Sequence, residues 1–130
     1  MTQEDKELLL KDLCARLPYN VKCKVHLDTK GYCLRDEDKY CDDTLESVNC
    51  EKQTCTFNKS IGYNFGYFAI EDVKPYLRPM SSIAELITAK EWSSLGGIDL
   101  IDWYNANHID YRGLIEKGLA LEAPEGMYEY

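Results

Sequence analysis

Residues 105–112 gather the side chains of this chain that are best suited to chemistry. The stretch NANHIDYR places His108, Asp110, Tyr111 and Arg112 within five positions. A histidine two residues from an aspartate can act as an oriented acid or base, or can bind a metal. One hypothesis is therefore a small hydrolase or nucleotide-modifying enzyme that uses His108 and Asp110.

The same residues also suit the end of one helix and the start of the next. Asn107 can adopt the left-handed conformation that ends helices, and Asp110 can cap a following helix. The chain also lacks the G-x-x-x-x-G-K-[ST], G-x-S-x-G and H-E-x-x-H patterns of well-known active sites. We therefore favour a protein that is not an enzyme, with no catalytic residues, no metal and no cofactor.

A wider set of residues suits the binding of a ligand or partner. Arginines beside aromatic side chains can hold a phosphate or carboxylate, and tyrosines are common at protein interfaces. The candidate surface consists of Tyr76, Arg78, Trp103, His108, Asp110, Tyr111 and Arg112. The predicted function is non-enzymatic binding of a host protein, or sequestering of a small anionic ligand.

The cysteines are numerous for a chain of this length. They are Cys14, Cys23, Cys33, Cys41, Cys50 and Cys55, and no two of them form a C-x-x-C pair. Without such a pair the sequence carries no zinc signature, and a reducing compartment disfavours disulfides. We predict small, buried, apolar side chains, and whether Cys33, Cys41, Cys50 and Cys55 bind a metal stays open.

Length and charge narrow the function classes. A length of 130 residues is typical of one domain, so we expect a single domain over 1–130. The net charge of −8 repels phosphate backbones, which disfavours nucleic-acid binding and leaves room for a basic protein partner. The polar start MTQEDKELLLKDL resembles neither a signal peptide nor a membrane span, so we expect a cytoplasmic protein without membrane contact.

The order of the predicted elements favours an α+β fold. Leucines recur at helical spacing over 3–16, and alternating apolar residues in VKCKVHL begin a small antiparallel sheet over about 19–70. Within the sheet region, 36–43 reads as an acidic loop. Two or three helices should then occupy about 82–118, one from the S-x-x-E box at Ser82, one from Asp99 and one from Asp110 to Gly118. A barrel-like closure of the sheet is an alternative to an open one.

Three segments of the sequence resemble a group of small, functionally uncharacterised proteins from phages and mobile elements of gut Bacteroidales. They are TQEDKELLLKDLCARLPYNVK, EDVKPYLRPMSS and NANHIDYRGLIEKGLALEAPEGMY, roughly half of the chain. The cysteine-rich middle, about 28–66, and the segment SIAELITAKEW depart from that group. The resemblance implies a phage or prophage accessory protein made inside a bacterial host, and it carries over no site residues.

A structural or assembly role is the last alternative. The tyrosine-rich region 61–68 could join two copies of the chain in a symmetric homodimer.

Overall fold

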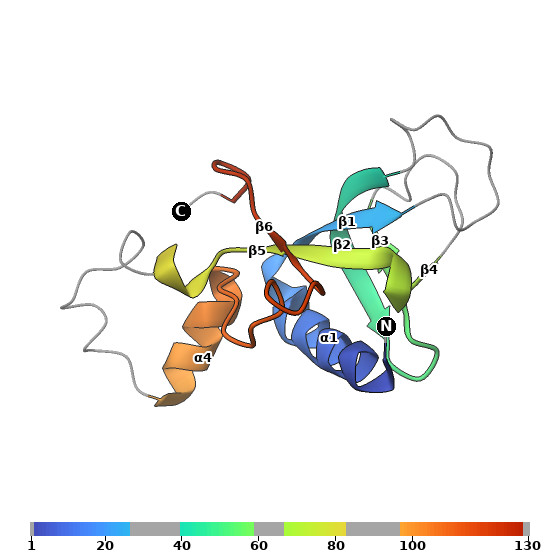
Figure 1. Cartoon of the computed structure of the whole chain (residues 1–130), viewed down its shortest axis with the longest axis horizontal. Coiled ribbons are helices and arrows are strands. Elements are labelled where there is room, and N and C mark those ends of the chain that lie inside the picture. The colour runs from blue at the N-terminus through green and yellow to red at the C-terminus, as the bar shows by residue number, and fades with distance from the viewer. Residues whose placement is uncertain (1, 27–39, 59–66, 83–96, 129–130) are drawn as a thin grey trace. The chain divides into compact units, whose positions relative to one another are not determined.

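A computed structural model describes residues 2–26, 40–58, 67–82 and 97–128 (Figure 1). Its contacts divide the chain into two compact units, Met1–Pro75 and Tyr76–Tyr130. The first unit combines a helix with an antiparallel sheet, and the second combines a helix with turns and a short strand. The predicted α+β class is confirmed. No helix among the described residues is long and apolar enough to cross a membrane.

The first helix, α1 (Gln3–Arg16), has the predicted bounds. The Thr2 hydroxyl accepts a hydrogen bond from the Asp5 amide at 3.1 Å, and this cap satisfies one of the free amides of the first turn. Leu9, Leu10 and Leu13 are buried, as their spacing requires. After a 3-10 turn, η1 (Leu17–Tyr19), a left-handed Asn20 turns the chain into the sheet.

One feature of α1 that the sequence did not predict is a buried ion pair on the same face. The Arg16 guanidinium donates to both carboxylate oxygens of Asp12, at 2.8 and 3.1 Å. Both side chains have no exposed surface. Each charge therefore depends on the other for its stability in the interior.

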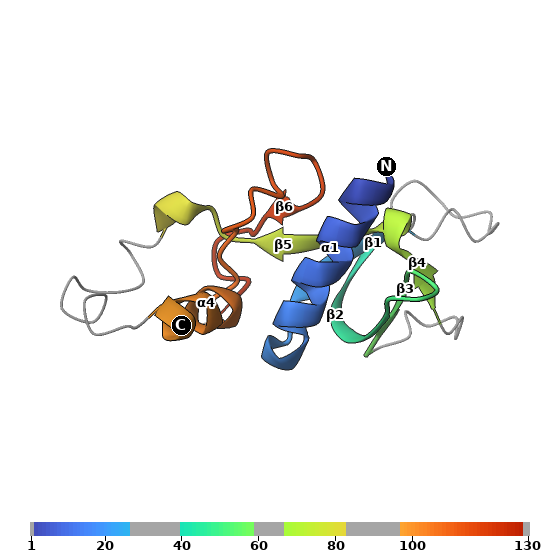
Figure 2. The same cartoon turned by 90° about the horizontal axis from the view of Figure 1, so that it is seen from below.

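The sheet of the first unit is antiparallel. Its strands are β1 (Lys22–His26), β2 (Tyr40–Asn49), β3 (Thr54–Phe57), β4 (Phe68–Ala69) and the first part of β5 (Val73–Leu77). In β1, Cys23 and Val25 are buried and alternate with half-buried lysines, as predicted. β2 has a register shift between Leu45 and Ser47. The strand is strongly bent, and α1 lies along one face of the sheet (Figure 2).

Two predictions about the sheet need correction. The acidic segment 36–43 was expected to be a loop, but Tyr40–Asp43 begins β2, where these residues pair with Cys23–His26 of β1 and Asp42 lies opposite Lys24. The strand order is β4-β3-β2-β1-β5-β6, and in the described residues the outer strands do not pair with each other. The sheet is therefore open and not a barrel.

The second unit contains a 3-10 turn, η6 (Met80–Ser82), the helix α4 (Gly97–Ala106) and the strand β6 (Leu121–Glu122). β6 pairs in parallel with Tyr76 and Leu77 at the end of β5, a pairing the sequence did not predict. α4 corresponds to the helix expected from Asp99. The helix expected after Ser82 lies outside the described residues, as do 27–39 and most of the tyrosine-rich region 61–68.

The third C-terminal helix was predicted wrongly. Residues 110–118 form successive turns, so one α-helix follows the sheet in the described residues where two or three were expected. Gly113 has a φ of +74°, outside the helical region, and this residue interrupts any regular helix from Asp110.

Candidate functional site

The predicted site residues all belong to the second unit, where the chain leaves α4 and crosses beside β5. His108 has a φ of +58°, so the left-handed residue that ends the helix is His108 and not Asn107. Ile109 then forms a parallel bridge with Arg78. The Arg78 amide donates to the His108 carbonyl at 2.7 Å, and the Asp110 amide donates to the Arg78 carbonyl at 2.8 Å.

Arg78, His108 and Tyr128 form one cluster of side chains. The His108 and Tyr128 rings stack with their centroids 3.9 Å apart, and the Arg78 guanidinium lies 5.4 Å from the centre of the Tyr128 ring. Arg78 donates to the Asn107 carbonyl at 2.8 Å and to the Tyr128 carbonyl at 2.9 Å. All three side chains are buried. The cluster holds the C-terminal segment against the end of α4.

Tyr76 contributes to this cluster through its backbone. The Tyr128 hydroxyl donates to the Tyr76 carbonyl at 2.8 Å, so Tyr128 links β5 to the C-terminal segment. Tyr128 was missed in the sequence analysis. It lies 50 residues from Arg78 and 20 from His108, and no local pattern points to such partners.

Tyr111 and Arg112 form a second cluster, which does not include Arg78. The Tyr111 hydroxyl donates to the Asn105 side-chain oxygen at 3.0 Å and accepts from Arg112 at 2.8 Å. The Tyr111 ring stacks on Tyr104 at 5.4 Å, and the Arg112 guanidinium lies 4.8 Å from the Tyr111 ring. Trp103, half-buried, meets Tyr104 edge to face. The two predicted arginines are therefore engaged by different partners.

Asp110 has a structural role that uses its whole carboxylate. One oxygen accepts from the Leu114 amide at 2.8 Å and the other from the Ile115 amide at 3.0 Å. Asp110 thus caps a turn, the local role expected of it, although the helix expected to follow is absent. A carboxylate with both oxygens on backbone amides is poorly placed to orient His108 as a base.

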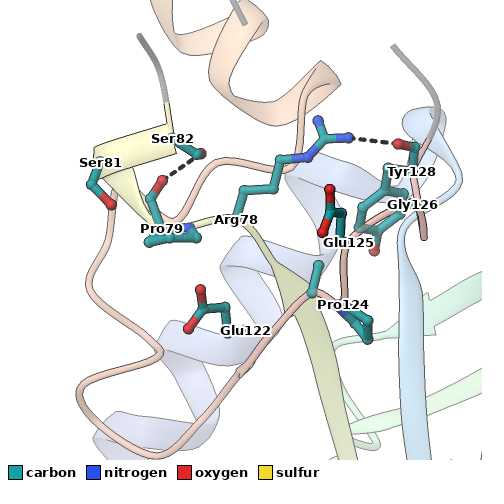
Figure 3. A pocket seen from close by; sticks show the side chains of 10 residues that line it. Arg78, Pro79, Ser81, Ser82, Glu122, Pro124, Glu125, Gly126 and Tyr128 are labelled. Atoms are coloured by element: carbon teal, nitrogen blue, oxygen red, sulfur yellow. Dashed lines mark hydrogen bonds between the residues drawn. The ribbon is translucent and has the colours of Figure 1, made fainter. Parts of the chain in front are cut away.

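An open pocket of about 500 Å³ lies beside the first cluster (Figure 3). Its lining residues are Arg78, Pro79, Ser81, Ser82, Glu122, Ala123, Pro124, Glu125, Gly126 and Tyr128. Figure 3 shows the Arg78 side chain directed along the pocket toward the Tyr128 carbonyl. Neither His108 nor Asp110 lines the pocket, which gives the hydrolase hypothesis no support.

The pocket has an acidic edge that the sequence analysis did not single out. Glu122 and Glu125 are both exposed. Among the described residues neither carboxylate forms a salt bridge. Arg78 is 6% exposed, and its guanidinium donates to two carbonyls. The accessible charge of the pocket is therefore negative, which favours a cationic group over an anionic one.

Comparisons of the chain with protein-family models, curated proteins and solved structures give no match.

Proposed function

We propose that the protein is a non-enzymatic binding protein that recognises a basic segment of a host protein at the acidic pocket of its second unit. The observation that carries the proposal is the presence of two exposed carboxylates, Glu122 and Glu125, among the residues that line a pocket of about 500 Å³. A pocket of this size accommodates one or two side chains of a partner. Lysine and arginine are the side chains that two carboxylates attract.

The contacts of the arginines favour this partner over a small anionic ligand. Arg78 donates to the Asn107 and Tyr128 carbonyls, and Arg112 donates to the Tyr111 hydroxyl. Arg78 is 6% exposed, so an anion in solution reaches little of its guanidinium. The Arg112 guanidinium lies against the Tyr111 ring and does not line the pocket. The resemblance to phage proteins is the reason to seek the partner inside a bacterial cell.

Carbodiimide cross-linking tests the proposal because it joins a carboxylate to a lysine only when the two are in contact. The full chain is mixed with lysate from a Bacteroidales strain, and cross-linked peptides are mapped by mass spectrometry. The expected result is a link from Glu122 or Glu125 to a lysine of one partner. That partner should be lost from a pull-down with a Glu122→Lys/Glu125→Lys variant.

The matched control is Asp102→Lys/Glu116→Lys. It makes the same change in charge, and both residues are exposed in the same unit but do not line the pocket. This control should retain the partner. If both variants lose the partner equally, binding depends only on net charge. If the cross-links map to residues away from the pocket, the pocket is not the binding site.

A further inference from the structure

Two thiol groups of the first unit lie close together, those of Cys14 and Cys50. The Sγ atoms of Cys14 and Cys50 are 3.4 Å apart, although 36 positions separate the residues in the chain. Both residues are exposed. The expectation that the cysteines are buried apolar side chains holds for Cys23 and Cys55 but is wrong for this pair.

The backbone on both sides of the pair is well held. Cys14 lies in the last turn of α1, two residues before the buried Arg16. Cys50 directly follows β2, in a turn where the Asn49 side chain accepts from the Lys52 amide at 3.0 Å. The same turn is joined to the segment after β4, because the Ile70 amide donates to the Gln53 carbonyl at 2.9 Å. The two sulfur atoms are thus kept together by the fold.

We propose that Cys14 and Cys50 form a reversible intramolecular disulfide when the protein meets a small disulfide oxidant such as glutathione disulfide. The bond needs a sulfur–sulfur distance of about 2.05 Å, so the two atoms must approach by about 1.4 Å. Rotation of two exposed side chains can supply that movement. The proposal does not depend on the pocket of the second unit or on its partner.

Two exchange steps close the bond. In the first, the thiolate of one cysteine breaks the S–S bond of glutathione disulfide and releases one glutathione thiolate. In the second, the other cysteine loses its proton to solvent and attacks the protein sulfur of this mixed disulfide, and the second glutathione leaves. Partial burial of the thiol, and then the neighbouring Cys50, raise the pKa of Cys14 to about 11.

The balance of the reaction is two protein thiols oxidised and one glutathione disulfide reduced to two glutathione thiols. The two buried cysteines, Cys23 and Cys55, are poorly placed to compete. Burial raises the pKa of the Cys55 thiol to about 12 and raises that of Cys23 well above its usual value. Both remain protonated and shielded from an oxidant in solution.

Intact mass spectrometry of the full chain tests the proposal. The protein is equilibrated with a series of glutathione and glutathione disulfide ratios, quenched with acid, and alkylated. The expected product lacks two hydrogens, has two fewer alkylated thiols, and returns to the starting mass with a dithiol reductant. Cleavage after Arg16 and after Glu46 separates Cys14, Cys41 and Cys50 onto different peptides, so the linked pair can be identified.

Variants complete the experiment. Cys14→Ser and Cys50→Ser should each abolish the loss of two hydrogens, while the matched control Cys41→Ser should retain it. Because the linked peptide is identified in the unmodified chain, poor folding of a variant cannot imitate the expected result. The absence of a Cys14–Cys50 link at every ratio would overturn the proposal. So would a link from either residue to a different cysteine.

Discussion

Removal of the Asp12 carboxylate should destabilise the first unit more than any surface substitution in α1. In the unmodified protein the Asp12 carboxylate accepts two hydrogen bonds from the buried Arg16 guanidinium, at 2.8 and 3.1 Å. The variant Asp12→Asn removes this negative charge. Both side chains have no exposed surface, so water cannot take the place of the carboxylate without local opening. The loss of one member of a buried pair costs about 3–5 kcal/mol.

The loss of stability in Asp12→Asn is best measured by hydrogen exchange of the α1 amides. The two tryptophans of the sequence, Trp92 and Trp103, both follow residue 75, so tryptophan fluorescence does not report on the first unit. Hydrogen exchange measures the free energy of opening at each amide. A loss of about 3–5 kcal/mol should speed the exchange of the best-protected α1 amides by roughly two to four orders of magnitude.

Two further variants separate the cost of an unpaired charge from other causes. Glu7→Gln, an exposed substitution in the same helix, should change the opening free energy by less than about 0.5 kcal/mol. The double variant Asp12→Leu/Arg16→Met removes both charges and should recover most of the lost stability. A cost below about 1 kcal/mol for Asp12→Asn, or a double variant as unstable as the single one, would refute the stabilising role of the buried pair.

Three other changes probe the remaining contacts. Asp110→Ala removes the acceptor of the Leu114 and Ile115 amides and should lower the unfolding free energy of the second unit by about 1–3 kcal/mol, measured by urea titration of tryptophan fluorescence. An unchanged midpoint would contradict this role. Oxidation of Cys14 and Cys50 closes a loop of 36 residues and should stabilise the first unit by about 4 kcal/mol, seen as slower α1 exchange than in the reduced protein. Equal α1 exchange in the oxidised and the reduced protein would contradict this stabilisation. The Lys6 ammonium, 2.5 Å from Glu71, lowers the pKa of that carboxyl below its usual 4.5. The pair therefore stabilises the fold above that value and loses its effect as the pH falls through the lowered pKa, so stability measured over this range should fall less steeply in Glu71→Gln.

The sequence predicts the first unit best where its structure depends on residues that are close together in the chain. The bounds of α1 follow from the Thr2 cap and the leucine spacing, and β1 follows from its alternation of apolar and polar residues. The buried ion pair could in principle be predicted from the sequence, since Asp12 and Arg16 are four residues apart on the same face as Leu9 and Leu13. Charged residues are rarely buried, so the spacing alone does not predict a buried pair at these positions.

The elements that escaped prediction depend on distant partners. β5 contains Lys74 and Pro75, which weaken its resemblance to a strand, and its partners are β1 and β6. β6 is two residues long and pairs in parallel with a segment more than 40 positions earlier. The contact between Cys14 and Cys50 is of the same kind. Spacing within a short window carries no information on any of these pairings.

The reactive residue types around His108 have a common physical explanation. Residues 107–120 are mostly turns, so their backbone groups cannot pair in a helix or a long strand. Side chains supply the missing partners: Arg78 donates to the Asn107 carbonyl, and Asp110 accepts from the Leu114 and Ile115 amides. Buried backbone groups need hydrogen-bond partners, and side chains can supply them where the backbone is irregular. Their concentration here follows from that need, so residue types alone cannot distinguish this segment from a catalytic site. The proposed function rests instead on the exposed carboxylates of Glu122 and Glu125.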